Sequence, residues 1–283
     1  MLSSTPLRGA VRQCWSRQRR TFSASNFQQV ELSYQRIEPP SSNGQPSGQP
    51  IIFMHGLFGS KRNNRSISKA LARDLNRDIY IVDLRNHGDT GHAQEHTYDS
   101  LAEDVAGFVR QHRLGKTVLI GHSMGAKTAM TLALRSPETI AGLIPGMKEI
   151  EAAGVTKQSE ADEILAKYES ALPIRQFLLT NLIRDPESAN HALKFRVPLD
   201  ILGSALDDMA FFPFSDGVTY NGPTLFIRGL HSTYVSDKTV PAIKKFFPNA
   251  QIADIESGHW VISEKPEEFR QAVLSFFKEN EVE

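Results

Sequence analysis

The sequence predicts an α/β protein whose mostly parallel, doubly wound sheet carries a helical cap insertion. Short apolar runs such as 51–54 and 79–82 alternate with segments of helical periodicity such as 66–75. This spacing is typical of a parallel sheet, because parallel neighbours need a crossover connection. Between about residues 146 and 221 the strand pattern disappears and apolar residues recur at helical spacing. We therefore expect a sheet interrupted by a helical insertion.

The individual elements follow from the same periodicities. We expect strands at 30–37, 51–54, 79–82, 117–120, 140–145, 223–229 and 251–255. The helices that cover the sheet are expected at 66–75, 99–112, 126–134, 240–247 and 266–278. Within the insertion we expect helices at 147–153, 160–169 and 174–183. The insertion would cover the carboxyl ends of the strands, where open α/β sheets bind substrates; ordinary crossover helices are the alternative.

Size and composition fit one globular core and argue against several kinds of partner. The chain has 283 residues, 40% hydrophobic and 23% charged, which is enough to bury a sizeable core. Lys plus Arg and Asp plus Glu number 32 each, so no net charge attracts nucleic acid. No apolar run approaches the roughly 18 residues of a membrane-spanning helix. The single cysteine, Cys14, excludes an intrachain disulfide framework and a cysteine-based metal cluster.

The first 30 residues differ in composition from the rest. They contain five arginines, several Ser and Thr, and no acidic residue before Glu31. This composition is typical of a mitochondrial transit peptide, with a disordered basic tail as the alternative. The run Arg20-Thr21-Phe22-Ser23 resembles a processing site. We expect a transit peptide at 1–22 and a matrix location, followed by a core in two parts, 23–145 and 222–283, with the helical cap at 146–221 between them.

The strongest functional signal is the pattern G-x-S-x-G at residues 121–125, directly after an apolar run. A sharp strand-to-helix turn needs small residues two before and two after its centre, because a Cβ there would clash. Ser123 would stand alone at the tip, beside helix amides that favour developing negative charge. We predict that Ser123 is a nucleophile; a purely structural turn is the alternative.

A serine hydroxyl needs a neighbouring base to accept its proton, and imidazole suits this role at neutral pH. The run 256–260 (ESGHW), which contains His259, directly follows the last expected strand, and His259 comes after Ser123 in the chain. Gly258 would allow the backbone to bring the ring inward. We predict that His259 is the general base; a packing histidine is the alternative.

A tetrahedral intermediate of acyl transfer develops charge on oxygen and needs preorganised N–H donors. We predict one donor in the amide of Met124, which follows the nucleophile, and the other in the loop 55–60. Within that loop we choose Leu57, with Phe58 as the near alternative. The phosphate-binding pattern G-x-x-x-x-G-K-[ST] is absent, so nucleotide binding is not expected.

Several motifs together resemble the α/β-hydrolase superfamily: HGLFGS (55–60), DLRNHG (83–88), GHSMG (121–125), FPNAQI (247–252) and SGHWVISEKPEEF (257–269). Within it the chain looks like the mitochondrial abhydrolase-domain-eleven group, small bacterial esterases and fungal ethanol acetyltransferases, over about 32–277. The resemblance implies an α/β-hydrolase fold and a serine hydrolase that acts on ester or thioester bonds through an acyl-enzyme, with no metal and no cofactor. It also implies that Asp83, Arg85 and His87 organise a loop and perform no chemistry.

One part of the family pattern is missing. A triad needs a carboxylate that holds the histidine in the right tautomer. The resemblance implies the Asp of a V-D-x-x-P segment after the strand that follows the elbow helix, but here that strand, 140–145, runs directly into a helical pattern. Weak candidates are Asp200 in the insertion and Asp237 after the strand 223–229, with Glu149 below both. The catalytic acid stays unassigned.

Two explanations of this gap remain open: a shortened variant of an active enzyme, or a scaffold that keeps Ser123 and His259 yet turns over poorly. The enzyme would hydrolyse a small-molecule acyl ester or thioester, or transfer its acyl group to a small alcohol in a drier pocket. The non-enzymatic alternative is a protein that binds or stabilises another mitochondrial protein. Apolar residues of the insertion are expected to line the pocket, namely Phe177, Leu178, Phe211 and Phe212.

Overall fold

The computed structural model describes residues 28–41, 44–134, 143–169, 172–188, 191–210, 218–232 and 234–280. The expected transit peptide at 1–22 lies outside these ranges, as do the start of the expected strand 140–145 and two expected pocket residues, Phe211 and Phe212. In the described chain, strands and helices alternate around a mostly parallel sheet. The predicted α/β architecture is therefore confirmed.

The larger sheet has four strands in the order β1-β3-β2-β4. These are β1 (Tyr34–Ile37), β2 (Ile51–Met54), β3 (Ile79–Val82) and β4 (Val118–Gly121). Only β1 is antiparallel to its neighbour, and it lies at the edge, as expected for 30–37. Met54 at the end of β2 is in register with Gly121 at the end of β4. The loops that leave these two strands therefore start side by side.

A second, parallel pair is formed by β7 (Thr224–Gly229) and β8 (Ala250–Ile255), which end in register at Gly229 and Ile255. Within the described residues this pair is separate from the four-stranded sheet. The helices around the two sheets are α1 (Arg65–Leu75), α2 (Tyr98–Gln111), α3 (Met124–Ala133), α8 (Val240–Phe246), α9 (Val261–Glu264) and α10 (Pro266–Glu279). Each of the five longer helices lies within two residues of its predicted bounds at both ends.

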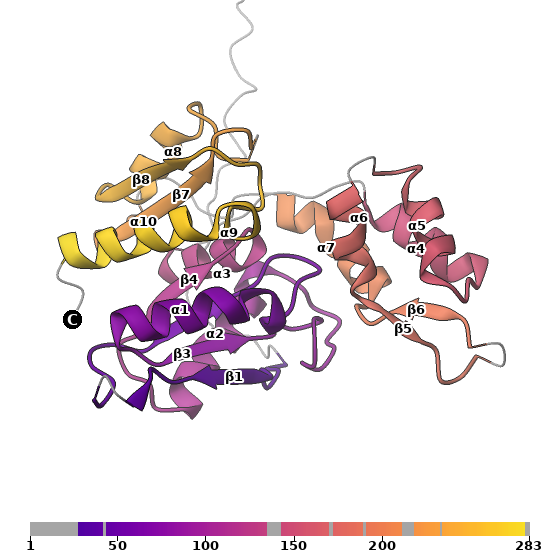
Figure 1. The fold of residues 1–283 in the computed structure, drawn as a ribbon, viewed down its shortest axis with the longest axis horizontal. Coiled ribbons are helices and arrows are strands. Elements are labelled where there is room, and N and C mark those ends of the chain that lie inside the picture. The colour runs from indigo at the N-terminus through magenta and orange to yellow at the C-terminus, as the bar shows by residue number, and fades with distance from the viewer. Residues whose placement is uncertain are drawn as a thin grey trace, which may run out of the picture.

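Alternate side chains of β2 point to opposite faces of the sheet. Ile51 and Phe53 join an apolar cluster with residues of α1 and α10, whereas Ile52 and Met54 join a cluster with residues of α2 and α3. All four side chains are fully buried. Figure 1 shows these helices around the sheet. A strand that is apolar at every position is the pattern expected when helices cover both faces.

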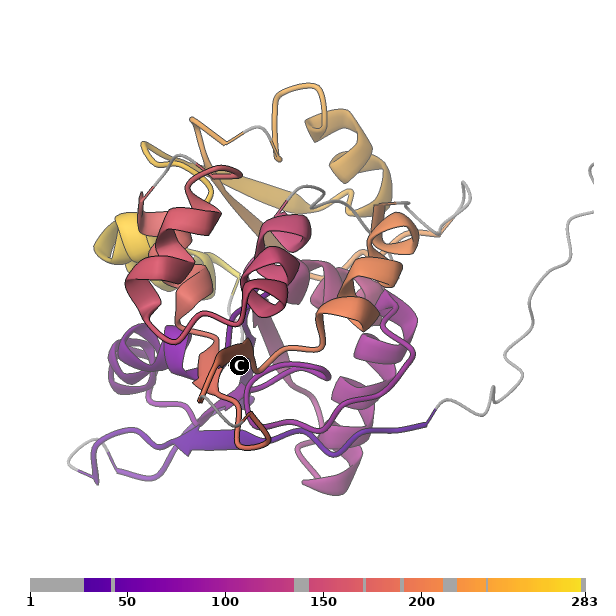
Figure 2. The same ribbon diagram turned by 90° about the vertical axis from the view of Figure 1, so that its right-hand side faces the viewer.

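The segment between α3 and β7, residues 143–210, is called the inserted segment below. It contains α4 (Leu143–Ala153), α5 (Gln158–Leu165), α6 (Leu172–Leu179), β5 (Leu182–Arg184), β6 (Leu193–Phe195) and α7 (Leu199–Ala210). It lies beside the sheet in Figure 1 and faces the viewer in Figure 2. Its buried side chains, such as Leu178, share one apolar cluster with Leu57 and Phe58 of the loop after β2.

Two expectations for this part of the chain are wrong. The expected strand 140–145 is helical from Leu143 onward. Met147 and Ile150 of this helix are fully buried, so the apolar side of the helix packs against the core. Pro145 is tolerated because it lies in the first turn, where a backbone N–H has no partner within the helix.

The insertion is also not purely helical. The expected helix 174–183 ends at Leu179, and Ile183 pairs with Lys194 in an antiparallel hairpin. Two residues beyond the helix, the backbone N–H and the side-chain amide of Asn181 both donate to the Leu178 carbonyl, at 3.0 and 3.3 Å. Such local bonding competes with helix continuation. The expected helix 160–169 begins earlier, as α5, and ends at Leu165.

Candidate active site

Ser123 occupies a sharp turn between β4 and α3, with φ 50° and ψ −113°. This is a strained backbone conformation for a residue with a side chain, costing on the order of 1–3 kcal/mol, and such strain clusters at functional sites. A Cβ on Gly121 would overlap the backbone of Gly125, and one on Gly125 would lie 2.5 Å from the Met54 carbonyl oxygen. Only glycine fits at both positions, and the serine alone projects from the turn.

His259 lies on the loop between β8 and α9, at the carboxyl end of its strand. Its ring packs against those of Tyr234 and His122, with centroids 4.2 and 5.0 Å away. Its Nε2 is buried and has no hydrogen-bond partner in the described structure. Burial, with smaller contributions from His122 and Lys127, lowers the pKa of His259 to about 4. The imidazole is therefore neutral at pH 7, with a nitrogen free to accept a proton.

His122 connects the histidine loop to the serine turn. Its Nε2–H donates to the backbone oxygen of His259 at 3.0 Å, and His122 immediately precedes Ser123. Burial lowers the pKa of His122, so this ring too is neutral. No hydrogen bond joins the Ser123 hydroxyl to His259 in the described residues. The bond from His122 nevertheless joins the two loops, so Ser123 and His259 lie on neighbouring loops.

Glu264 holds the same loop from the opposite side. Its carboxylate accepts the N–H of Gly258 at 2.7 Å and the N–H of Trp260 at 3.2 Å. These are the two residues that flank His259. A charged acceptor for two neighbouring amides fixes the backbone from which the imidazole projects.

The loop after β2 is a tight turn in which the N–H of Gly59 donates to the carbonyl of Gly56 at 2.9 Å. His55 braces it: its Nδ1–H donates to the Gly56 oxygen at 2.8 Å, and its Nε2 accepts the N–H of Leu84 at 3.0 Å. Burial lowers the pKa of His55, which favours this neutral form. The amides of Leu57 and Phe58 donate to no other group in the described chain and remain available.

Met124 is the first residue of α3, so its amide has no acceptor within the helix. A Cβ built on Gly56 would lie 3.3 Å from the Ser123 Cβ. The loop that carries Leu57 therefore runs directly beside the serine. The three expected elements, a serine turn, a histidine loop and a loop with unused amides, meet at the ends of β4, β8 and β2.

Neither weak candidate for the acid touches His259. Asp200 pairs with Lys148 at 2.6 Å and is 95% exposed, and Asp237 pairs with Arg228 at 2.8 Å and is 92% exposed. Both assignments are therefore not supported, because each carboxylate is occupied at the surface. Glu149 lies in α4, and its side chain is outside the described atoms. Among the described residues, no carboxylate hydrogen-bonds the His259 ring.

The loop after β3 is stabilised by buried charges. Asp83 is fully buried and accepts the backbone N–H and the ammonium of Lys61, at 2.6 and 2.5 Å. Arg85 makes a bidentate pair with Asp104 at 2.5 and 2.7 Å, with both side chains buried. His87 is buried as well. These contacts organise a loop, which is the role that the resemblance implies.

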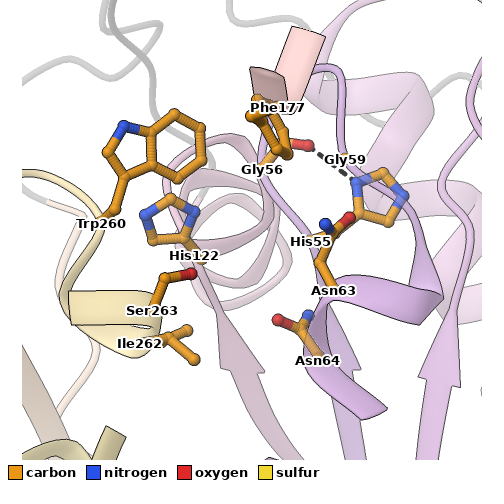
Figure 3. Close-up of a pocket in the computed structure, with 10 residues that line it drawn as sticks. All are labelled: His55, Gly56, Gly59, Asn63, Asn64, His122, Phe177, Trp260, Ile262 and Ser263. Atoms are coloured by element: carbon orange, nitrogen blue, oxygen red, sulfur yellow. Dashed lines mark hydrogen bonds between the residues drawn. The ribbon is translucent and has the colours of Figure 1, made fainter. Parts of the chain in front are cut away.

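A small pocket of about 50 Å³ is lined by His122 and Trp260, the sequence neighbours of Ser123 and His259. Figure 3 shows His122 and Trp260 on one side of it and His55, bonded to Gly56, on the other. Phe177 of α6 closes it, with its ring 4.6 Å from that of Trp260. Leu178 was expected to line a pocket, but it is absent from the lining of this one; it is only 1% exposed and packs in the core.

Sequence reasoning missed three contacts of the site. His122 and Glu264 belong to two of the family motifs, GHSMG and SGHWVISEKPEEF, so the sequence already marked them as candidates. Tyr234 lies in an irregular loop after β7 and had no pattern to mark it. In the described chain, no group of three or more His, Cys, Asp or Glu could hold a metal ion, and no helix is long and apolar enough to cross a bilayer.

Comparison with known proteins gives consistent matches. The α/β-hydrolase fold family matches residues 49–145. The chain is 37% identical to the mouse sn-1-specific diacylglycerol lipase ABHD11, over 89% of this chain and 87% of that protein. It is 35% identical to a probable alcohol acetyltransferase of Saccharomyces cerevisiae, over 89% of this chain and 84% of that one. A solved marine microorganism esterase superposes with a TM-score of 0.75 at 29% identity, covering 87% of this chain and 99% of that one.

Proposed function

We propose that this chain, which belongs to the α/β-hydrolase family, is a serine hydrolase that cleaves carboxylic ester or thioester bonds through an acyl-enzyme. One observation carries the proposal. Ser123 stands on a strained turn, and the loop bonded to that turn through His122 presents a neutral imidazole with an unpartnered Nε2. A relative named as a lipase and a similar esterase structure support ester chemistry.

The reaction follows from the roles of these groups. The Ser123 oxygen attacks the acyl carbon while His259 Nε2 takes the hydroxyl proton, and the carbonyl π electrons move onto oxygen. The amides of Leu57 and Met124 stabilise that oxyanion. The C–O or C–S bond then breaks, and the leaving alcohol or thiol takes the proton from His259. Water repeats the sequence on the acyl-enzyme, releasing the acid and restoring Ser123.

The expected turnover rate depends on the fact that no carboxylate is assigned as the partner of His259. In serine proteases, loss of the orienting carboxylate lowers turnover by about ten-thousandfold, while the oxyanion hole still contributes. Glu264 fixes the backbone beside His259 but does not bond its ring, so it does not take over the role of the orienting carboxylate. We propose slow turnover. The alternative, a protein that binds or stabilises another protein, differs from this in predicting no serine-dependent chemistry at all.

Acyl transfer to a small alcohol is the second candidate. The relative named as a probable alcohol acetyltransferase, at 35% identity, favours it. The chemistry is the same until the second step, in which an alcohol instead of water attacks the acyl-enzyme. Adding ethanol to the assay distinguishes the two: a transferase forms ethyl ester in preference to free acid, whereas a hydrolase forms mainly acid.

We also propose that the protein acts in the mitochondrial matrix. The support is the composition of the first 30 residues, which are rich in arginine and serine and lack acidic residues. A fluorescent protein fused to the carboxyl end of the full chain should colocalise with a mitochondrial marker. The same fusion without residues 1–22 should lose that location; retention would contradict the assignment.

The test of the activity is turnover of p-nitrophenyl esters of graded acyl length, and of one acyl thioester, by the purified full chain. We expect slow turnover that Ser123→Ala abolishes. Asp200→Asn and Asp237→Asn should match the parent, because both carboxylates pair with surface cations away from His259. A selective loss in one of them would identify the acid and contradict our placement. Turnover that survives Ser123→Ala would overturn the proposed function.

A further inference from the structure

The turn that carries the proposed oxyanion donor Leu57 contains an unfavourable residue. Phe58 has φ 61°, in the left-handed region that favours glycine, and a residue with a side chain there costs roughly 1–2 kcal/mol. Its ring is buried. Such a conformation persists only if surrounding contacts hold it. The contacts that hold the Phe58 backbone therefore help to maintain the turn that carries the Leu57 amide.

One side of this turn is held by the core. The Gly56 carbonyl accepts the amide of Gly59 and the ring N–H of His55, at 2.9 and 2.8 Å. Both bonds act on the carbonyl of the Gly56–Leu57 peptide, the peptide that also carries the Leu57 N–H. The Phe58 carbonyl belongs to the same peptide as the Gly59 N–H, and it is left for another donor.

That donor comes from the inserted segment, 123 residues away in the chain. The side-chain Nδ2 of Asn181 donates to the Phe58 carbonyl at 2.7 Å, in a buried setting. Asn181 lies between α6 and β5 and is 7% exposed. Its own backbone is fixed twice, because its N–H donates to Leu178 at 3.0 Å and its carbonyl accepts the N–H of Arg196 at 2.8 Å. The amide group is therefore preorganised before it meets the loop.

We propose that Asn181 is a positioning residue for the oxyanion hole: by holding the Phe58 carbonyl, it couples docking of the inserted segment to alignment of the Leu57 amide. This inference rests on the proposed function for its catalytic consequence. The inserted segment then does more than cover the site, because the hole is fully formed only while this segment is docked. Substrates that separate the segment from the loop would lose transition-state stabilisation as well as contacts.

Three variants distinguish a positioning role of Asn181 from a general contribution to the stability of the fold. Asn181→Ala removes the donor, and Asn181→Asp keeps the shape but places a carboxylate against the Phe58 oxygen. Thr180→Ala is the matched control, because Thr180 is exposed on the same turn and its hydroxyl bonds only the carbonyl of Phe177. Removing a complete oxyanion donor typically costs 10²–10³ in kcat, so misplacing one should lower kcat about tenfold with KM unchanged.

Two measurements on the full chain complete the test. Hydrogen exchange of a peptide covering 55–60 reports the turn, since the Gly59 amide is protected by its bond to Gly56. Affinity for a trifluoromethyl ketone, which adds to the serine as an oxyanion, reports the hole. We expect faster exchange and weaker inhibitor binding, in step with the fall in kcat, in both Asn181 variants but not in Thr180→Ala.

The outcomes distinguish this inference from the proposed function. Exchange at 55–60 equal to the parent in both Asn181 variants would overturn the inference, whatever the activity. A raised KM with an unchanged kcat and inhibitor affinity would also overturn it, because that pattern indicates lost substrate contacts only. If the parent has no Ser123-dependent activity while the variants still loosen the turn, the proposed function fails and the anchoring by Asn181 stands.

Discussion

Replacing Glu264 should slow the reaction by a predictable amount, because this carboxylate accepts backbone hydrogen bonds on both sides of His259. It accepts the amides of Gly258 and Trp260 at 2.7 and 3.2 Å. Glu264→Ala removes both acceptors and leaves the loop free to move the imidazole away from Ser123. Glu264→Gln keeps one oxygen that can still accept one amide.

The size of the effect follows from the setting of these bonds. Hydrogen bonds to a charged group contribute about 1.5–3 kcal/mol when well shielded, but Glu264 is exposed, so we take about 1 kcal/mol for each. Losing both bonds destabilises the loop conformation that presents His259 to Ser123 by about 2 kcal/mol. This corresponds to about a thirtyfold fall in the population of that conformation. The glutamine variant should lose about fivefold, for one bond.

The assay is kcat for a p-nitrophenyl ester, with the melting temperature measured alongside. Glu268→Gln is the control, since Glu268 lies on α10 and, among the described residues, forms an ion pair only with Lys265, at 3.0 Å. The reasoning is refuted if Glu264→Ala retains the parent kcat, or if Glu268→Gln loses as much activity as Glu264→Ala.

Three further predictions concern stability and are measured by chemical or thermal unfolding. Ser123→Gly should stabilise the fold by about 1–2 kcal/mol, because glycine relieves the φ of 50°; no gain would mean that the turn is unstrained. Asp104→Asn should destabilise it by about 3–5 kcal/mol, since it leaves the buried Arg85 unpaired, and a loss below 1 kcal/mol would contradict this. Burial lowers the pKa of His96 to about 3 and that of His87 well below its usual range. The unfolded chain therefore binds more protons, so the unfolding free energy should fall as pH drops from about 6.5 toward 3, by up to about 1.4 kcal/mol per pH unit for each histidine; a flat profile would contradict it.

The sheet and its covering helices could be predicted because each buried strand is a short, uninterrupted apolar run. Ile51–Met54 and Ile79–Val82 are such runs. Each is too short to be read as a helix. The proposed serine and histidine could be placed for a related reason. Ser123 and His259 lie in segments that directly follow the strands β4 and β8, so the end of each strand fixes where its loop begins.

The inserted segment was harder to predict, because its elements are short and depend on tertiary contacts. Leu182–Arg184 continues the apolar spacing of the preceding helix, and only pairing with Leu193–Phe195 makes it a strand. The bond from Asn181 to Phe58 joins residues 123 positions apart, and nothing in a polar side chain at a helix end indicates its distant partner. The same limit hid the packing of Tyr234 on His259.

Labelling with a fluorophosphonate across pH tests most directly whether an imidazole activates the serine. We expect the parent chain to be labelled, Ser123→Ala to be unlabelled and His259→Gln to react at least about a hundredfold more slowly. The labelling rate of the parent should rise with pH around 4, where His259 loses its proton, and stay level from about 5 to 8. Labelling of Ser123→Ala, or equal rates for the parent and His259→Gln, would contradict the account.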